Sequence, residues 1–429
     1  MRSEIVRDLV LRALAGIFDE QKPAERVLER TLRAHRELGS AERAAVARRV
    51  LGIACFRARL EHLIPQAGAG EAARHRWLLA AYLIDQERAE VPEAASASGL
   101  SEGEVSHLAA AGSWPSEPVD RLAAERSLPR WLADLWIEQL GAPEADRLAE
   151  AMNRPGPITA RANTLRCSRD ELVERLAQEG IAASPARWSP DGLHLSGRPN
   201  VFGSQAWREG LFEIQDEGSQ LIAQLAAPRP GERCIDFCAG AGGKTLALAA
   251  LMRDQGELWA LDVNEQRLAD MRPRLARAGA SIVRPLAMEP QGALPEQLEP
   301  AEVVLVDAPC SSLGTLRRGP DSRWRTRPDD VAAFPELQHA ILERAARYVR
   351  PGGRLVYATC TINRGENEEV AARFQQSHPG FEPAQPPPGF AGPLCPDGAM
   401  RLFPHIHGTD GFFACAWRRR RDHEGAKLR

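Results

Sequence analysis

Apolar strand-like runs alternate with helical segments from about residue 216 onward, and this alternation restricts the fold more than any other feature of the chain. Continuous apolar strands separated by helices predict a parallel α/β sheet covered by helices on both faces. The strand candidates are 233–237, 258–262, 281–284, 303–307 and 354–359, with helical segments at 244–252, 265–278, 329–349 and 366–374. A last strand at 412–417 is expected to join the sheet edge in antiparallel orientation.

Two further regions precede the α/β region, which would cover 216–421. Residues 1–140 have almost no strand signal, and their apolar residues recur at helical spacing, which predicts an all-helical domain. Residues 154–215 predict a small α+β module, in which Ser168 would cap a helix. Its strand candidates lie at 158–165, 193–195 and 211–214.

Charge and cysteine content limit where such a protein acts. The net charge of -3 gives no overall sign of nucleic-acid binding, although residues 1–62 carry thirteen Lys or Arg against nine Asp or Glu. Eight cysteines without short regular spacing predict reduced thiols rather than zinc ligands or disulfides. The chain has no signal-peptide pattern and no apolar run of the ~20 residues needed to span a bilayer. We expect a cytoplasmic monomer without membrane or metal partners.

A glycine loop joins the first predicted strand to its helix. Gly240, Gly242 and Gly243 would let the backbone approach a ligand closely, and the helix start offers free N–H groups. A P-loop is disfavoured because Cys238 stands where that motif needs glycine. A dinucleotide-binding loop is disfavoured because its pattern, G-x-G-x-x-G, is not matched. A loop beneath the methionine part of S-adenosylmethionine is the third interpretation, with Asp262 binding the ribose hydroxyls. The alternative is that the glycines form only a tight turn and that Asp262 only caps a helix. This alternative is disfavoured because the glycine loop and the acid stand at the ends of consecutive strands, as a cofactor site requires.

Two cysteine motifs lie about fifty residues apart. Asp307-Ala308-Pro309-Cys310 and Thr359-Cys360 each stand at the carboxyl end of a strand candidate. Ligands bind at this edge of open α/β sheets, so two thiols there suggest covalent chemistry in which one attacks and the other helps it leave. A single cysteine at a strand end would be interpreted as a small buried residue. Two cysteines, each at a strand end and each beside its own motif residues, disfavour that structural interpretation.

Through these motifs and several others, the chain resembles the RsmB/NOP2/Sun family of RNA cytosine-C5 methyltransferases. The matching segments are 215–219, 236–245, 307–312, 317–324, 357–362, 365–368 and 408–413, within 155–417. The resemblance implies a Rossmann-like class I methyltransferase sheet. The helical N-terminal domain resembles a NusB-type RNA-binding domain, which implies 16S rRNA as the substrate.

The resemblance also implies roles for individual residues. Cys360 would attack C6 of cytosine, Cys310 would assist release of the adduct, Asp307 would hydrogen-bond the base near N3, and Lys244 would touch or polarise it. S-adenosylmethionine would contact the glycine loop and the strand ends, namely Cys238, Ala239, Gly240, Ala241, Gly242, Gly243, Lys244, Asp262, Met288 and Asp307.

Two positions depart from the family pattern. Ala241 stands where the glycine loop more often has proline. The family also usually has an aspartate after the third strand to contact adenine, whereas this chain has Leu286-Ala287-Met288-Glu289. Either Met288 packs on the adenine ring or Glu289 replaces the missing acid.

An arginine-rich stretch after Cys310 is the main candidate for RNA contact. Arginines there could bind phosphates while Trp324 stacks on a base, and the alternative is a solvated loop in an arginine-rich protein. The candidates are Arg317, Arg318, Arg323, Trp324 and Arg325, together with Arg161 and Asn163 in the small module.

The expected function is S-adenosylmethionine-dependent methylation of RNA cytosine at C5 through a covalent cysteine adduct. A tRNA substrate is the alternative within this chemistry, and a non-catalytic RNA-binding or assembly factor on a methyltransferase scaffold is the alternative outside it. A scaffold would need neither Cys310 nor Cys360. A DNA cytosine methyltransferase is disfavoured, because such enzymes usually place the nucleophile in a Pro-Cys motif.

Overall fold

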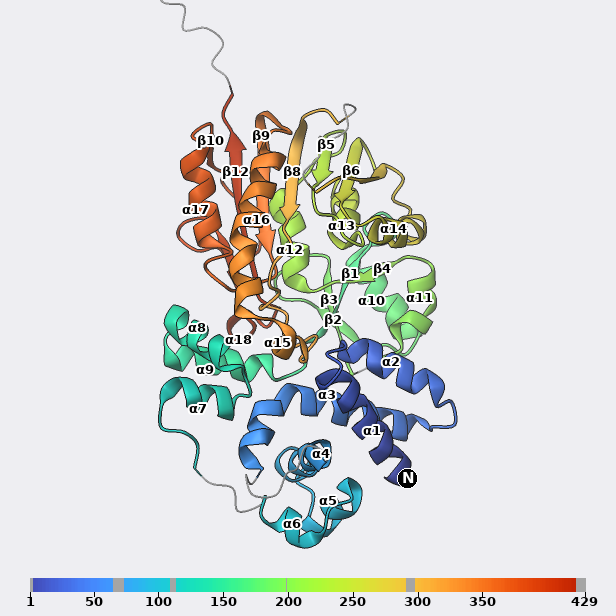
Figure 1. Ribbon diagram of the computed structural model, residues 1–429. Helices are drawn as coiled ribbons and strands as arrows, with labels where there is room; N and C mark the ends of the chain where they lie inside the picture. The colour runs from blue at the N-terminus through green and yellow to red at the C-terminus, as the bar shows by residue number, and fades with distance from the viewer. Residues whose placement is uncertain (1–2, 65–72, 109–112, 198, 291–297, 422–429) are drawn as a thin grey trace, which may run out of the picture. The chain divides into compact units, whose positions relative to one another are not determined.

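The computed structural model describes residues 3–64, 73–108, 113–197, 199–290 and 298–421, and the chain divides into two compact units (Figure 1). The first unit comprises Met1–Pro155 and the separate segment Thr315–Pro328. The second comprises Gly156–Gly314 and Asp329–Arg429.

The first unit is helical throughout its described residues. Its helices are α1 Ser3–Phe18, α2 Ala24–Ala34, α3 Ser40–Leu63, α4 Arg74–Asp85, α5 Val91–Ser98, α6 Glu102–Ser106, α7 Pro118–Glu125, α8 Arg130–Leu140, α9 Ala142–Met152 and, from the separate segment, α15 Ser322–Arg325. The i, i+3, i+4 spacing of apolar residues gives each long helix a buried face; in α1 this face holds Val6, Leu9, Val10, Ala13, Leu14 and Ile17. The helices continue to Met152, twelve residues beyond the expected end of the helical region at 140.

A small antiparallel sheet opens the second unit. Its strands run in the order β2-β3-β1-β4. The elements are β1 Ile158–Ala162, α10 Arg169–Gln178, β2 Ala183–Pro185, β3 Gly192–Leu195, the 3-10 turn η2 Val201–Gly203, α11 Gln205–Arg208 and β4 Phe212–Ile214. Ser168 caps α10 as expected, because its hydroxyl accepts from the Glu171 N–H while the Glu171 carboxylate accepts from the Ser168 N–H.

The remaining strands form one large sheet in the order β10-β12-β9-β8-β5-β6-β7, with β11 paired to β12. Its strands are β5 Arg233–Asp236, β6 Glu257–Asp262, β7 Val283–Ala287, β8 Ala301–Asp307, β9 Val349–Thr359, β10 Phe381–Pro383, β11 Met400–Leu402 and β12 Phe412–Arg419. Strands β5 to β9 pair in parallel, whereas β12 runs antiparallel to β9. The predicted α/β sheet and its antiparallel last strand are therefore confirmed.

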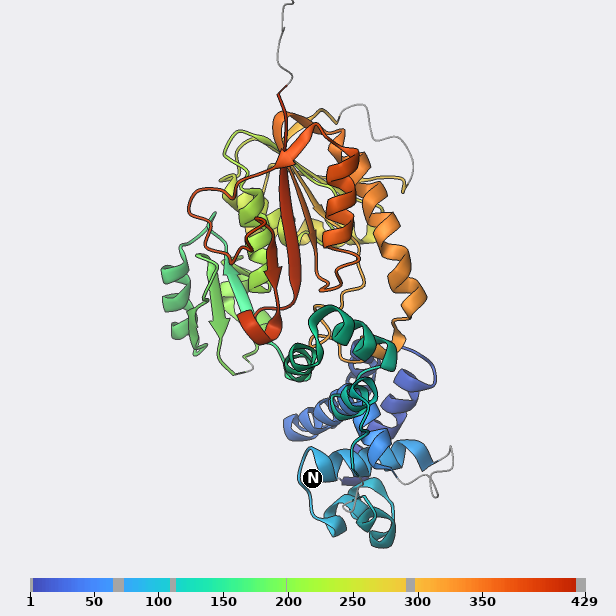
Figure 2. The ribbon, with the colours of Figure 1, turned by 90° about the vertical axis from the view of Figure 1, so that its left-hand side faces the viewer.

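Helices cover both faces of this sheet (Figure 2). They are α12 Glu217–Ala226, α13 Gly243–Leu251, α14 Glu265–Ala278, α16 Pro328–Ala346 and α17 Glu368–Ser377, and a single helical turn, α18 Pro404–His407, comes between β11 and β12. Alternate strand residues fill two separate cores: one packs against α12, α13 and α14, and the other packs against α16 and α17. None of the described helices combines the length and apolar character required to cross a membrane.

The strand order places the predicted motifs side by side. Strand β5 lies between β6 and β8, so consecutive connections leave it in opposite directions. The crevice at such a reversal, outside the carboxyl ends of the strands, is where open α/β sheets bind ligands. The glycine loop follows β5, and the Cys310 motif follows β8, so both border this crevice.

Candidate active site

A cleft of about 900 Å³ lies at the carboxyl edge of the large sheet. It is lined by the predicted cofactor and catalytic residues Cys238, Ala239, Gly240, Ala241, Gly243, Lys244, Asp262, Met288, Asp307, Cys310 and Cys360. Gly242 is not in contact with the cleft, and its role is in the shape of the loop.

The glycine loop needs glycine for two different reasons. Gly242 has φ +87°, and a Cβ there would lie 2.5 Å from Met271 Cγ, so a side chain is excluded by both conformation and space. A Cβ at Gly243 would meet nothing within 4 Å, so this position opens into the cleft at the N-terminus of α13. Arg274 Nη1 donates to the Ala241 carbonyl at 2.5 Å and holds the other side of the loop.

Asp262 joins the end of β6 to the glycine loop. Its two carboxylate oxygens accept from the Gly240 N–H and the Asn264 N–H, each at 2.8 Å. The glycine loop and the carboxylate are therefore one preorganised wall. Open space at Gly243, free N–H groups at a helix start and a carboxylate at the next strand end fit the ribose and methionine parts of S-adenosylmethionine.

Apolar side chains that could contact adenine line the cleft together with arginines such as Arg267 and Arg344. Met288 lies against Asp262, because its N–H donates to the Asp262 carbonyl at 3.0 Å. Val263 is 53% exposed and Leu337 is 47% exposed, and both line the cleft. Among the described residues that line the cleft, Glu289 does not occur, which favours Met288 over Glu289 as the neighbour of the adenine ring.

A partly buried ion pair lies in the cleft. Lys244 Nζ is 2.7 Å from Asp307 Oδ2, which connects the start of α13 to the end of β8. Burial lowers the pKa of Lys244, but the Asp307 carboxylate more than offsets this effect, so the pKa of Lys244 is raised above its usual value. Lys244 is therefore a fixed positive charge beside the cysteines.

The two cysteine sulfurs are 3.4 Å apart. Their proximity follows from the sheet, because β8 and β9 are parallel neighbours with Asp307 opposite Ala358. The Ser312 hydroxyl is also 3.4 Å from Cys360 Sγ. The sequence pattern predicted that both thiols lie at one sheet edge, and the structure confirms this juxtaposition.

The surroundings distinguish the two thiols. The hydrogen bond from Cys310 lowers the pKa of Cys360 against the effect of burial, and Ser312 and Lys244 act in the same direction. The same hydrogen bond, burial and the negative charges of Cys360 and Glu366 raise the pKa of Cys310 well above its usual value. These shifts favour the thiolate at Cys360 and the thiol at Cys310.

Several residues of the site were given no role by the sequence. Asp236 is fully buried, and burial raises its pKa to about 7 although Thr245 Oγ1 donates to it at 2.7 Å. Glu366 and Asn367 contact the residues that flank the two cysteines. The segment 365–368 matched the family pattern, and this match was the only signal that could have identified Glu366 and Asn367.

The predicted RNA role of Arg323 is wrong. Arg323 is fully buried in the first unit, where its guanidinium donates to the Ser127 carbonyl at 3.0 Å and to Asn153 Oδ1 at 2.7 Å. Trp324 Nε1 donates to the Ala54 carbonyl at 2.6 Å, and its ring packs on the helical core. The ring is therefore not the free stacking platform that was expected.

The other members of the stretch differ in exposure. Arg325 forms an ion pair with Asp321 at 3.0 Å, and Asp321 also accepts from the Ala24 N–H. Arg318 is exposed, and Arg317 and Arg325 are partly exposed, so RNA contact stays a prediction for these three arginines.

In the small module, Arg161 and Asn163 are buried instead of facing RNA. Arg161 donates to Gln215 Oε1 at 2.7 Å, and Asn163 Nδ2 donates to the Gly210 and Ala278 carbonyls.

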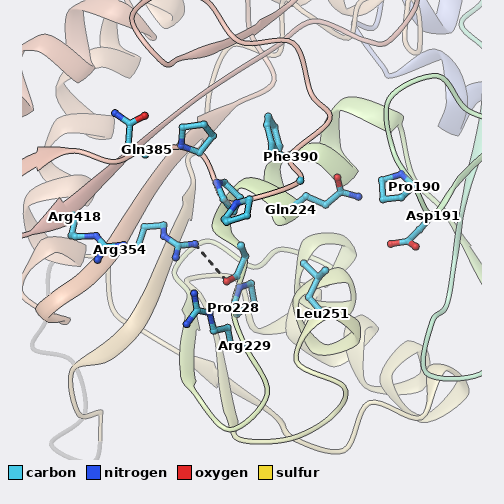
Figure 3. Close-up of a pocket in the computed structure, with 15 residues that line it drawn as sticks. Pro190, Asp191, Gln224, Pro228, Arg229, Leu251, Arg354, Gln385, Phe390 and Arg418 are labelled. Atoms are coloured by element: carbon cyan, nitrogen blue, oxygen red, sulfur yellow. Dashed lines mark hydrogen bonds between the residues drawn. The ribbon is translucent and has the colours of Figure 1, made fainter.

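A second hollow, of about 610 Å³, contains neither cysteine motif (Figure 3). Arg354 and Arg418, which lie opposite each other on β9 and β12, form part of its wall. Arg354 donates to the Ala226 carbonyl, so its charge stabilises the C-terminal end of α12. These contacts are structural, and the hollow is not a candidate for methyl transfer. In the described part of the chain, no group of three or more His, Cys, Asp or Glu is placed to hold a metal ion.

Known proteins share this architecture. The family model described as 16S rRNA methyltransferase RsmB/F matches residues 223–418, and the ferredoxin-like domain of RsmF/B-like methyltransferases matches residues 128–202. A relative from Bacillus subtilis, named probable ribosomal RNA small subunit methyltransferase B, is 36% identical over 309 residues, which cover 71% of this chain and 69% of the relative.

Two solved structures have a similar fold. The crystal structure of PH0851 has a TM-score of 0.78 and 26% identity, covering 97% of this chain and 99% of that one. A methyltransferase homologue from Pyrococcus horikoshii has a TM-score of 0.61 and 30% identity, covering 71% of this chain and 99% of that one. The chain belongs to the RsmB/F family of S-adenosylmethionine-dependent 16S rRNA methyltransferases.

Proposed function

We propose that this enzyme methylates carbon 5 of a cytosine in small-subunit ribosomal RNA through a covalent bond between Cys360 and C6. The observation that carries the proposal is the pair of sulfurs 3.4 Å apart, of which one favours the thiolate and the other the thiol. Carbon 5 of cytosine is a poor nucleophile, and thiolate addition at C6 makes it an enamine carbon.

The residues of the cleft support each step. The Cys360 thiolate forms the S–C6 bond, and the C5–C6 electron pair becomes available at C5. Asp307 would hydrogen-bond the base near N3, and Lys244 offsets negative charge that builds in the ring. S-adenosylmethionine, when bound, supplies the methyl group. The C5 proton then passes to solvent in the cleft, the electrons of the C5–H bond restore the C5–C6 double bond, and the S–C6 bond breaks. Cys360 leaves as a thiolate, to which the Cys310 thiol donates a hydrogen bond.

The substrate assignment rests on the relatives. The Bacillus subtilis protein is named for ribosomal RNA, and its match covers 71% of this chain. We infer that the chain has three domains: a NusB-like domain at 1–140, a small α+β module at 154–215 and a methyltransferase domain at 216–421. The NusB-like domain would bind RNA. A cytosine within paired RNA would first be extruded at a cost of a few kcal/mol, so an unpaired or looped site is favoured. A tRNA substrate is the alternative.

Bisulfite mapping tests this proposal. We expect one 16S cytosine to lose its C5 methyl group in a strain that lacks the gene and to regain it when the gene is restored. Cys360→Ala should not restore it, whereas Cys167→Ala, which changes a thiol outside the cleft, should. Full methylation with Cys360→Ala would contradict the covalent mechanism, and a methyl group lost from tRNA instead would favour the alternative substrate.

A further inference from the structure

We propose that Glu366 is a positioning residue that fixes the separation of the Cys310 and Cys360 loops. The inference rests on the proposed two-cysteine function and extends it to a side chain that is 0% exposed and does not line the cleft. Glu366 therefore acts on the reaction only through its neighbours.

One side of the Glu366 carboxylate holds the Cys310 loop. Its Oε2 accepts from the Ser311 N–H at 2.8 Å, and its Oε1 accepts from the Ser311 hydroxyl. Oε2 also accepts from Gln338 Nε2 at 3.0 Å, and the same amide nitrogen donates to the Pro309 carbonyl at 3.0 Å. The residues on both sides of Cys310 are thus fixed to Glu366 or to its partner on α16.

The same carboxylate holds the Cys360 loop. Thr361 Oγ1 donates to Oε1 at 3.3 Å, and Asn363 Nδ2 donates to it at 3.2 Å. The hydroxyls of Ser311 and Thr361 are 2.9 Å apart, so both loops meet at one carboxylate. The next residue, Asn367, accepts from Thr359 Oγ1 at 2.6 Å and donates to the Thr361 carbonyl at 3.1 Å.

Removing a carboxylate from water is expensive, and stability alone would favour apolar side chains of similar volume. No arginine, lysine or histidine within the described residues forms an ion pair with Glu366, so neutral donors alone balance its charge. A carboxylate accepts hydrogen bonds from several directions at once, and its charge strengthens each of them. It therefore adds side-chain links between two loops that one backbone hydrogen bond already joins, from the Gly314 N–H to the Cys360 carbonyl at 3.0 Å.

The negative charge of Glu366 has a second consequence at Cys310. The hydrogen bond with Cys360, burial and the charge of Cys360 raise the pKa of the Cys310 thiol, and the Glu366 charge adds to them in the same direction.

Glu366→Gln tests the inference, with Glu368→Gln as the matched control. The amide is nearly the same size, but it places an N–H₂ group against the N–H and O–H donors of Ser311 and Gln338, so the loops should separate. Glu368 lies two residues away, is bound to Arg401 at 2.6 Å, and contacts neither cysteine loop.

The first readout needs no RNA. The thiol oxidant diamide should join Cys310 and Cys360 in the wild type and in Glu368→Gln, because the sulfurs are already in contact, and peptide mass mapping would count the bond. We expect several-fold slower formation of this disulfide in Glu366→Gln. An unchanged rate would overturn the inference.

The second readout is turnover. Glu366→Gln should lower kcat by about 100-fold, as expected for a misplacement of about 1 Å, with little change in the KM for RNA. Binding of S-adenosylmethionine should be unchanged and reports that the sheet is folded. Should Glu366→Gln fail to bind the cofactor, the double variant Ser311→Ala with Thr361→Ala removes both hydroxyl donors to Oε1 and leaves the Ser311 N–H bonded to Oε2; normal disulfide and turnover rates in this variant would then overturn the inference.

The two proposals fail differently. If Cys360→Ala kept full turnover, the covalent mechanism would be wrong, but the oxidation assay would still report whether Glu366 sets the distance between the sulfurs.

Discussion

At the scale of single residues, the acidity of Cys360 depends on charges that lie on other elements. Lys244 is one of these charges, and its ammonium group is held by Asp307 at 2.7 Å. It lowers the pKa of Cys360, whereas Asp307 raises it. The pKa of Cys360 therefore depends on both of these charges, in addition to the hydrogen bond from Cys310.

Lys244→Met should raise the pKa of Cys360, because it removes the positive charge and leaves the Asp307 carboxylate unpaired. Less thiolate is then present at neutral pH, and alkylation of Cys360 by iodoacetamide should shift to higher pH. Mass mapping of the labelled peptide across pH gives the midpoint. Lys22→Met, an exposed lysine of the first unit, is the control, and an equal midpoint in both variants would contradict the assignment.

Asp236 predicts a pH dependence of stability. Burial raises its pKa from 3.8 to about 7, so the folded state holds a proton that the unfolded state has already released. This contribution is fully present below pH 3.8 and is lost as the pH rises through about 7, and it amounts to at most about 4 kcal/mol.

Asp236→Asn, which resembles the protonated acid, should therefore become more stable relative to the wild type between pH 5 and pH 8. Denaturant unfolding at both pH values measures this difference in free energy. A difference that does not change with pH would show that Asp236 is ionised in the folded protein.

At the scale of elements, the turn between β5 and α13 separates folding from binding. Gly242 has φ +87° and faces Met271, whereas Gly243 opens into the cleft. Gly242→Ala should lower the free energy of unfolding by about 1–3 kcal/mol through backbone strain. Gly243→Ala should preserve stability and weaken S-adenosylmethionine binding. Thermal melting and calorimetric titration of both variants distinguish the two effects, and the reverse pattern would contradict these roles of the two glycines.

The elements also show what sequence periodicity can and cannot predict. Apolar runs located β5, β6, β8 and β9, because each strand is buried on both faces. Strand β7 begins at Val283 instead of Ser281, and the three-residue strands β10 and β11 were not predicted, because so short a run carries little periodic signal. The cysteine pair was predictable because strand ends on one edge must converge.

Arg323 shows most clearly what a local sequence pattern cannot predict. Its neighbours in sequence form a basic cluster that resembles an RNA-binding loop, but its partners are Ser127, Met152 and Asn153. A partner about 170 residues away leaves no local pattern, so burial of this arginine could not be inferred. The positioning role of Glu366 could not be predicted for the same reason, because it depends on two loops that meet only in the folded protein.

At the scale of the whole molecule, the segment Thr315–Pro328 links the two units through the chain. It belongs to the helical unit, yet it leaves the second unit just after the Cys310 loop and returns at α16, which carries Gln338. Each unit has its own apolar core. Stability of the helical unit and RNA binding should therefore be separable by substitution.

Arg323→Ala should destabilise the helical unit by about 3 kcal/mol or more, because it leaves buried carbonyls without donors and opens a cavity. Arg318→Ala should preserve the melting temperature and, if Arg318 binds a phosphate, should reduce RNA affinity. Removal of one phosphate interaction would then lower the slope of log affinity against log salt by about 0.7–0.9. An unchanged slope would remove Arg318 from the RNA-binding surface, and an unchanged melting temperature in Arg323→Ala would contradict its structural role.

Mass mapping of the protein–RNA adduct is the most direct test of covalent catalysis. Cys310→Ala removes the thiol that assists release, so this variant should accumulate protein joined to RNA when it is mixed with small-subunit ribosomal RNA and S-adenosylmethionine. After digestion by nuclease and protease, we expect a methylated cytidine nucleotide on the peptide that carries Cys360. A nucleotide on any other residue, or complete turnover by Cys310→Ala without an adduct, would contradict the covalent mechanism.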